Sequence, residues 1–213
     1  MHTILGSEGP IATALGSDYE PRPQQLHMAK AVARALENKQ NLLVEAGTGV
    51  GKSFAYLAPA IDRILHRGER IVIATNTISL QEQLMEHDIP LLLDTLGAPA
   101  NDDPDTATQN WSGSLKAVLV KGRGNYVSVR RLKLASQRQD KLFADAASRE
   151  SLHIIEDWAY KTDDGTRSSL PQLPRMGVWD RVRSDSGNCM GRKCPTYDRC
   201  FYQAARREME QAD

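Results

Sequence analysis

Apolar residues in the first half of the chain follow two spacings in turn, one typical of helices and one typical of buried strands. Residues 22–38 repeat apolar side chains every three or four positions, which predicts a helix that starts near Pro23. The repeating positions are Leu26, Ala29, Val32, Ala33 and Leu36. A short unbroken apolar run follows at 41–44 and predicts a buried strand.

The same alternation continues through the next segments. Apolar runs at 70–75 and 115–120 predict two more strands. Helical patterns occupy 53–65 and 79–96, and we expect the second helix to bend at Pro90, because proline lacks the N–H that a helix interior uses. Strands that alternate with helices predict an α/β fold, in which a mostly parallel sheet carries helices on both faces.

The pattern changes after Lys121. Strand-like runs give way to helical, polar and basic segments, so we predict a mostly helical subdomain inserted at residues 125–207. The predicted order is then an N-terminal tail at 1–18, the first part of the core at 19–124, the insertion, and a return to the core at 208–213.

Charge says little for the chain as a whole, since 27 basic residues balance 27 acidic ones. Basic residues do gather at 121–133 and 192–207, which suits contact with nucleic-acid phosphates but is also common on solvated surfaces. No apolar run approaches the roughly 18 residues of a membrane helix, and the first residues lack the pattern of a secretory signal. We therefore expect a cytoplasmic protein with no membrane partner.

The segment from Gly47 to Ser53 (GTGVGKS) lies between a predicted strand and a predicted helix, where phosphate-binding loops occur. Glycines let the backbone curl around a polyphosphate, and the helix start behind them directs N–H groups toward the anion. Lys52 would contact the β and γ phosphates, and the Ser53 hydroxyl would ligate Mg²⁺. Ala46 replaces the first glycine of the usual pattern. The alternative is a glycine-rich turn that merely precedes a helix, but strand, loop, lysine, serine and helix all occur in order.

Five segments carry a resemblance to superfamily 2 helicases. YEPRPQQ at 19–25 resembles the adenine-recognising Q motif, EAGTGVGKS at 45–53 resembles motif I, and TNTISLQEQL at 75–84 resembles motif Ia. KGRGNY at 121–126 and the cysteine-bearing segment at 194–206 are similar to the DinG branch, relatives of the XPD-type helicases. The resemblance extends over nearly the whole chain.

The resemblance implies the core of an ATP-dependent DNA helicase, a RecA-like P-loop NTPase, with ATP and Mg²⁺ as cofactors and single-stranded DNA as partner. It assigns nucleotide binding to Arg22, Gln25, Glu45, Ala46, Gly47, Thr48, Gly49, Val50, Gly51, Lys52 and Ser53. Within that set, Lys52 and Ser53 are the catalytic residues. It assigns DNA binding to Thr75, Asn76, Thr77, Lys121, Arg123 and Asn125. Thr77 could instead only cap the helix that follows it.

Three cysteines crowd together at Cys189, Cys194 and Cys200, which favours metal or cluster binding over a disulfide framework. In the DinG branch, four cysteines of this insertion bind a 4Fe–4S cluster, but here the position of the first reads Ser128. Four thiolates usually complete such a site, so the ligand set is incomplete. A cluster with a serine ligand, a three-iron cluster, zinc, and a metal-free insertion are the alternatives.

The resemblance also implies an acidic segment of the D-E-A-H type, which holds Mg²⁺ and polarises the attacking water. No Asp-Glu pair follows a strand-like run within these 213 residues, so we expect the N-terminal part of a helicase that is inactive by itself. A non-catalytic nucleotide- or DNA-binding remnant is the main alternative. A small P-loop kinase is a third, and the insertion and the TNTISLQ segment argue against it.

Overall fold

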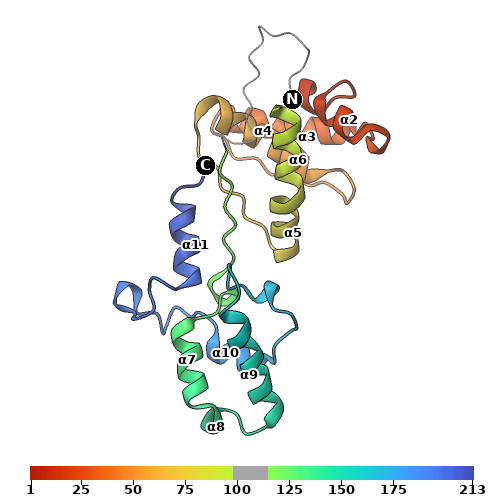
Figure 1. Cartoon of the computed structure of the whole chain (residues 1–213). Helices are drawn as coiled ribbons and strands as arrows, with labels where there is room; N and C mark the ends of the chain where they lie inside the picture. The colour runs from red at the N-terminus through yellow and green to blue at the C-terminus, as the bar shows by residue number, and fades with distance from the viewer. Residues whose placement is uncertain (98–114) are drawn as a thin grey trace. The chain divides into compact units, whose positions relative to one another are not determined.

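A computed structural model describes residues 1–97 and 115–213, which form two compact units. The first unit comprises residues 1–117 and 212–213, and the second comprises residues 118–211 (Figure 1). Each unit has a hydrophobic core of its own. The second unit contains the whole segment predicted as an insertion.

The first unit is built from helices joined by extended segments. Its helices are α1 (His2–Leu5), α2 (Pro10–Leu15), η1 (Gly16–Asp18), α3 (Pro23–Glu37), α4 (Lys52–Arg67), α5 (Ile78–Gln83), η2 (Leu84–Asp88) and α6 (Ile89–Gly97). The segment 1–18, expected as a tail, is helical instead. It belongs to the unit because Leu5 and Ile11 are buried in the core, at 4% and 3% exposure.

Helix α4 lies at the centre of this core. Its buried residues Leu57 and Ile61 pack in one cluster with Ala29 of α3. The helix begins after Gly51 and ends at Gly68, both in the left-handed backbone region that favours glycine, with φ of 76° and 62°. The Gly68 N–H donates to the Ile64 carbonyl at 2.9 Å, which closes the last turn.

The predicted bend at Pro90 takes the form of a π-helical turn. Helices α5 and α6 are joined by η2, which is π-helical over its five residues and ends immediately before Ile89-Pro90. A proline cannot donate to the carbonyl four residues earlier and crowds it, and a widened turn relieves both problems. The same turn places Asp88 on the inside of the unit, where only 6% of it is exposed.

The three predicted strands are not formed in the described residues. Segments 41–44, 70–75 and 115–120 are extended but make no strand ladder. Leu43 is 98% exposed and Val72 is 86% exposed, so their apolar side chains find no cover here. An extended segment becomes a strand only when its N–H and C=O groups pair with those of a neighbouring strand, and no described segment forms a strand ladder with these three.

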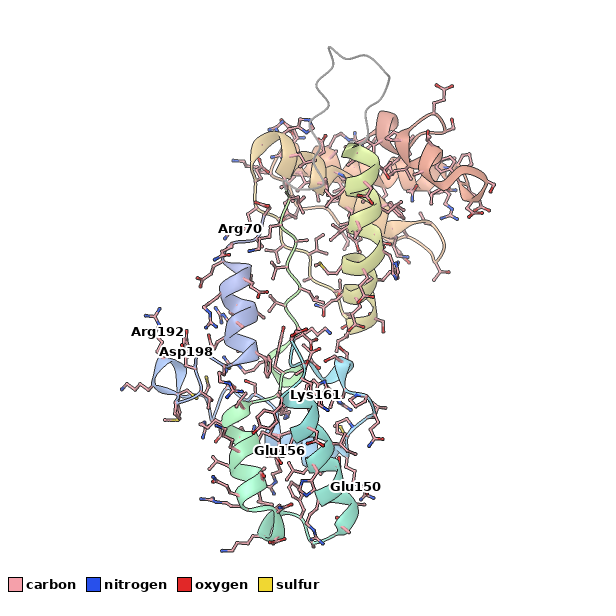
Figure 2. All side chains as sticks on the ribbon, in the orientation of Figure 1. Arg70, Glu150, Glu156, Lys161, Arg192 and Asp198 are labelled. Carbon is pink, nitrogen blue, oxygen red and sulfur yellow. The ribbon has the colours of Figure 1, made fainter. Side chains whose placement is uncertain are left out.

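The second unit is helical, as the sequence predicts for this region. Its helices are η4 (Arg123–Asn125), α7 (Val129–Gln137), α8 (Gln139–Leu142), α9 (Ala146–Ala159), η5 (Arg167–Ser169), α10 (Met176–Val182), η6 (Gly191–Lys193) and α11 (Phe201–Met209). Helices α7, α9 and α10 pack against one another (Figure 1). The Ser136 hydroxyl of α7 donates to the Glu156 carboxylate of α9 at 3.2 Å. Figure 2 labels Glu156 and, on the same helix, Glu150.

A short segment at the start of α7 ties the second unit together. Val127 donates its N–H to the Gly165 carbonyl at 2.9 Å, and Ser128 donates to the Val182 carbonyl at 2.8 Å. Two isolated antiparallel bridges, Tyr126 to Thr166 and Val127 to Arg183, are the β pairing found here. Val127 is fully buried, so this segment runs through the middle of the second core.

The chain leaves the first unit after residue 117 and re-enters it at residue 212. Residues next to these two points are hydrogen-bonded to each other. The Asp213 N–H donates to the Lys116 carbonyl at 3.1 Å, and the Lys116 N–H donates to the Asp213 carboxylate at 2.7 Å. Among the described helices, none has both the length and the apolar character needed to cross a membrane.

Candidate functional site

The predicted phosphate loop forms an open turn ahead of α4. Gly49 and Gly51 both adopt positive φ, at 81° and 76°, which lets the backbone reverse direction just before Lys52 starts the helix. Glu45, Gly47, Thr48 and Gly49 are exposed, and Ala46 and Val50 are partly buried. The loop therefore presents backbone groups to solvent at a helix N-terminus, as an anion site requires.

Gln25 of α3 is hydrogen-bonded to the backbone of the loop. Its Nε2 donates to the Gly51 carbonyl at 3.0 Å, and the residue is only 8% exposed. A Cβ on Gly51 would overlap Nε2, so the close approach requires glycine. Arg22, the N-cap of α3, has its guanidinium next to the same position and pairs with Glu20 at 2.9 Å. In the structure, Arg22 and Gln25 both lie next to the loop. Their contact with adenine stays a prediction.

Lys52 bends back over the loop. Its ammonium donates to the Gly47 carbonyl at 2.7 Å and to the Ala46 carbonyl at 3.2 Å, while the residue as a whole is exposed. The ammonium thus contacts two carbonyl oxygens, each of which carries a partial negative charge. A bound polyphosphate would offer full negative charge in place of two partial charges, so the exchange is favourable for the ammonium.

Tyr56, which the sequence analysis did not single out, lies one helical turn after Ser53 on α4. Burial raises the pKa of the Tyr56 phenol, the Ser53 side chain lowers it, and the Asp88 carboxylate raises it further. Asp88 accepts from Gln83 Nε2, at 3.2 Å and 3.4 Å to its two oxygens. The i, i+3 spacing of Ser53 and Tyr56 was the available signal that they share one face of the helix.

The segment Thr75–Thr77 leads into α5. The Thr77 hydroxyl accepts from the Leu80 N–H at 3.3 Å and is the N-cap of this helix, as the simpler reading of the sequence predicts. The Thr75 hydroxyl donates to the Thr77 carbonyl at 3.0 Å. All three residues, Asn76 included, are partly or fully exposed. A DNA strand could reach them, and their DNA contact stays a prediction.

Lys121 does not lie on a surface that DNA could contact. The residue is 5% exposed, and its ammonium donates to Ser168 Oγ at 2.6 Å and to Thr166 Oγ1 at 3.2 Å. Its backbone N–H donates to the Tyr126 hydroxyl at 2.9 Å. Thr166 also donates to Asp164, so a buried polar network occupies this lysine. This burial argues against a DNA contact from the Lys121 ammonium.

Arg123 and Asn125 are likewise engaged inside the second unit. The Arg123 guanidinium lies 4.2 Å from the centre of the Tyr202 ring, a cation–π distance. Asn125 donates to the Gly122 carbonyl at 3.1 Å and closes a turn. Both residues are only partly exposed. Their contribution to DNA binding stays a prediction, and these contacts give each a structural role.

The three cysteines and Ser128 line one small cavity of the second unit, with a volume of about 30 Å³. Space of this size holds about two water molecules. A backbone N–H from Gly191 and the Arg123 side chain lower the pKa of the Cys189 thiol. The Ser128 hydroxyl caps α7 by accepting from the Arg131 N–H at 3.5 Å.

These donors do not fit a 4Fe–4S cluster. Within the described residues, no group of three or more His, Cys, Asp or Glu side chains is arranged to hold a metal ion. The fourth position carries the Ser128 hydroxyl, which already caps α7. We derive no step through an iron–sulfur group.

Exposed basic side chains gather on the cysteine-bearing loop and on α11. They are Arg192, Lys193, Arg199, Arg206 and Arg207. Figure 2 shows Arg192 on this loop, beside a stretch that also carries the acidic Asp198. The Arg207 guanidinium lies 5.5 Å from the centre of the Tyr197 ring. The positive charge that the sequence predicts near 192–207 is thus accessible, whereas that of Lys121 is not.

The comparison with protein families finds a match in the first unit. Residues 24–97 match the DEAD/DEAH box helicase family. The matched region contains Gln25, the phosphate loop, the segment Thr75–Thr77 and helices α3 to α6. The match supports the resemblance that these segments carry in the sequence.

Similar proteins are found along the whole chain. The ATP-dependent DNA helicase YoaA of Escherichia coli is 33% identical over 214 residues, covering 100% of this chain and 30% of the relative. The ATP-dependent helicase DinG of Mycobacterium tuberculosis H37Rv is 35% identical over 92% of this chain and 30% of the relative. The ATP-dependent DNA helicase DinG of Salmonella choleraesuis is 31% identical over 92% of this chain. The chain spans about 30% of the length of these relatives.

Proposed function

We propose that this chain is the nucleotide-binding part of an ATP-dependent DNA helicase, on the premise that residues 24–97 match the DEAD/DEAH box helicase family. The proposed site holds ATP and Mg²⁺ on the loop from Gly47 to Ser53, with Lys52 on the terminal phosphates. The proposed reaction of the complete motor is ATP hydrolysis coupled to movement along single-stranded DNA.

The observation that carries the proposal is the arrangement of Gln25, Gly51 and Lys52. Gln25 holds the loop through the Gly51 carbonyl at 3.0 Å, and Lys52 sits at the start of α4 with its ammonium over the loop. A polyphosphate needs backbone amides, a helix start and a cation in one place, and these residues supply all three. Ser53 is the residue that would hold Mg²⁺, which neutralises phosphate charge in such sites.

The proposed fold of this part is a RecA-like sheet. Segments 41–44, 70–75 and 115–120 are the candidate parallel strands. Exposed apolar side chains in the first two, such as Leu43 and Val72, support that reading, because parallel strands are covered on both faces. Their pairing partners would be strands of a longer polypeptide, of the length of the relatives.

We propose two separate DNA-contacting regions, one in each unit. One is the exposed segment Thr75–Thr77, and the other is the basic set Arg192, Lys193, Arg199, Arg206 and Arg207. Contacts from these groups would be to backbone phosphates, which are read without sequence preference.

Nucleotide titration tests the proposal. Fluorescent N-methylanthraniloyl-ATP with Mg²⁺ is added to this chain and to its Lys52→Ala variant, and binding is followed by anisotropy. Because the lysine makes a charge-assisted contact, we expect the variant to lose roughly tenfold or more in affinity. Lys30→Ala, an exposed lysine of α3, is the control and should bind as the parent chain does.

Unchanged affinity in Lys52→Ala would mean that the nucleotide site lies elsewhere. The same preparation distinguishes the non-catalytic alternative. Binding without hydrolysis is expected of this chain, since no Asp-Glu pair follows its strand-like segments. In a polypeptide of the relatives' length, hydrolysis stimulated by single-stranded DNA would support the motor, and its absence would favour the remnant.

A further inference from the structure

Asp164 organises a short loop of the second unit. One oxygen of its carboxylate accepts from Ser169 Oγ at 2.6 Å and from Thr162 Oγ1 at 2.9 Å. The same oxygen accepts from the Thr166 backbone N–H at 3.1 Å, and the other oxygen accepts from the Thr166 hydroxyl. Four donors within eight residues of the chain thus meet at one carboxylate, which fixes the loop at 162–169.

The segment that enters the second unit holds this loop from one side. The Lys121 ammonium donates to Thr166 Oγ1 at 3.2 Å, and Tyr126 forms an antiparallel bridge with Thr166. The Val127 N–H donates to the Gly165 carbonyl at 2.9 Å. Lys121, Tyr126 and Val127 are all buried, so the loop is attached to a closely packed part of the unit.

The other side of the loop meets α11 at its first residue, Phe201. Gly165 has a φ of 60°, and a Cβ at this position would overlap the Phe201 ring, so backbone and ring are in direct contact. The Phe201 side chain also packs against the second core. The next residue, Tyr202, lies edge-on to Tyr126 with 5.6 Å between the ring centres. The first turn of α11 is therefore seated on the loop and on the entering segment.

The later turns of α11 are not packed in this way. Ala204, Ala205 and Glu208 line a cavity of about 150 Å³, which Lys121 and Asp164 also line. A cavity of this volume holds several water molecules, so side chains do not fill the space. No residue of α11 itself is fully buried. The direction of this helix therefore depends on the seat of its first turn.

We propose that Asp164 is a positioning residue for the DNA contacts of α11. Arg206 and Arg207 lie on this helix, are exposed, and belong to the DNA-contacting region proposed for the second unit. The carboxylate fixes the loop, the loop seats Phe201 through Gly165, and the seated helix presents its two arginines in one arrangement. Cations that are already held in place bind phosphates at a smaller entropic cost than mobile ones do.

This inference rests on the proposed DNA contact of the second unit and deepens it. Its expected effect is opposite in sign to that of charge alone. Removal of an acidic residue near a DNA-contacting region reduces the repulsion of phosphates and strengthens binding. Removal of a positioning carboxylate weakens binding instead, because the arginines must then be ordered when DNA binds.

The experiment measures DNA affinity by the anisotropy of a fluorescein-labelled oligothymidylate of about 20 nucleotides. We expect Asp164→Ala to lower the affinity about five- to tenfold. Asp163→Ala is the matched control, since this exposed neighbour carries the same charge and makes none of the hydrogen bonds described above. It should bind at least as tightly as the parent chain. Ser169→Ala removes one donor without a change in charge and should lower the affinity about twofold.

A second background separates positioning from general damage to the fold. In Arg206→Ala/Arg207→Ala, α11 no longer presents these cations, so the addition of Asp164→Ala should cause no further loss of affinity. A substitution that only destabilised the unit would lower the affinity in both backgrounds. Hydrogen–deuterium exchange gives an independent readout. In Asp164→Ala, amides of α11 should exchange faster than in the parent chain, and amides of α9 should exchange at the parent rate.

The outcomes distinguish the inference from the function on which it rests. Parent-like affinity in Asp164→Ala, or an equal loss in both backgrounds, would overturn the inference and leave the proposed DNA contact in place. Parent-like affinity in Arg206→Ala/Arg207→Ala, or a parent chain that binds no oligothymidylate, would overturn the DNA contact of α11 and the inference with it. The nucleotide titration is independent of these results, so the proposed nucleotide site would stand in each case.

Discussion

Gly51 meets two demands at one backbone position. Its φ of 76° lies in the left-handed region, and Gln25 Nε2 occupies the space that a Cβ would need. We expect Gly51→Ala to cost about 1–2 kcal/mol in backbone strain and, in addition, to push Gln25 away from the loop. The loss in binding free energy should therefore exceed the loss in unfolding free energy. Nucleotide titration measures the first, and urea unfolding measures the second.

Gly68→Ala is the control for that experiment. Gly68 also has a positive φ, at 62°, but nothing lies within 4 Å of the space its Cβ would occupy. It should lose a similar amount of stability and keep its nucleotide affinity. If both variants lose nucleotide affinity equally, the Gln25 contact does not matter for binding.

Single residues show how far the sequence could lead. Lys52 and Ser53 could be proposed as phosphate and Mg²⁺ ligands because a fixed spacing predicts that chemistry, and their roles stay predictions. The burial of Lys121 could not be predicted, because charge in a sequence does not reveal burial, and its partners Thr166 and Ser168 lie more than forty positions further along the chain. The burial of Asp88 could not be predicted for the same reason. An acidic residue two positions before a proline gives no sign that a helical turn will direct it inward.

At the scale of elements, helices were predictable and strands were not confirmed. A helix such as α4 satisfies its own hydrogen bonds, so an apolar repeat within one segment predicts it. A strand depends on a partner segment, and the run at 70–75 contains no information on whether that partner is present. The π-helical turn before Pro90 follows from proline chemistry, although its exact form did not.

Helices α3 and α4 are also joined by a group of ion pairs around Arg63, which is 7% exposed. Arg63 binds Glu69 with two nitrogens, at 2.8 Å and 2.5 Å, and binds Glu37 of α3 at 2.7 Å. A hydrogen bond from Arg67 lowers the pKa of Glu37, and a hydrogen bond from Arg63 lowers the pKa of Glu69, both below the ordinary 4.5.

This arrangement predicts a loss of stability in acid. Because both folded-state pKa values lie below the unfolded value, the stabilisation is complete above pH 4.5 and is lost as the pH falls through the lowered pKa values. Urea unfolding between pH 6 and pH 3 should show a steep fall below about pH 4.5. Glu37→Gln with Glu69→Gln should flatten that fall, and Glu86→Gln, an exposed glutamate of the same unit, should not. A parallel fall in all three proteins would show that these pairs do not set the acid limit.

At the scale of the molecule, the second unit has a hydrophobic core of its own, so we expect it to fold without iron. Its core includes Trp179, Leu152 and Ile155, each at most 2% exposed, and Ser128 caps α7. We expect the chain to keep its helical circular dichroism and melting temperature in a strong chelator. The purified protein should show no iron–sulfur absorbance band.

Ser128→Cys provides the comparison for that expectation. The substitution restores a fourth thiol beside Cys189, Cys194 and Cys200, at the cost of a helix cap. Anaerobic reconstitution should load more iron on this variant than on the parent chain. A parent chain that takes up a full cluster would contradict the expectation.

The pair of hydrogen bonds between Lys116 and Asp213 bears on how such a molecule could arise. The points where the chain leaves the first unit and where it comes back are adjacent, so the residues between them form a closed excursion from the core. A stretch of gene encoding residues 118–211 could enter or leave the coding sequence here and disturb neither neighbour. A short peptide that joins residue 117 to residue 212 should then be enough to replace the second unit. By the same reasoning, another domain could be inserted at this position.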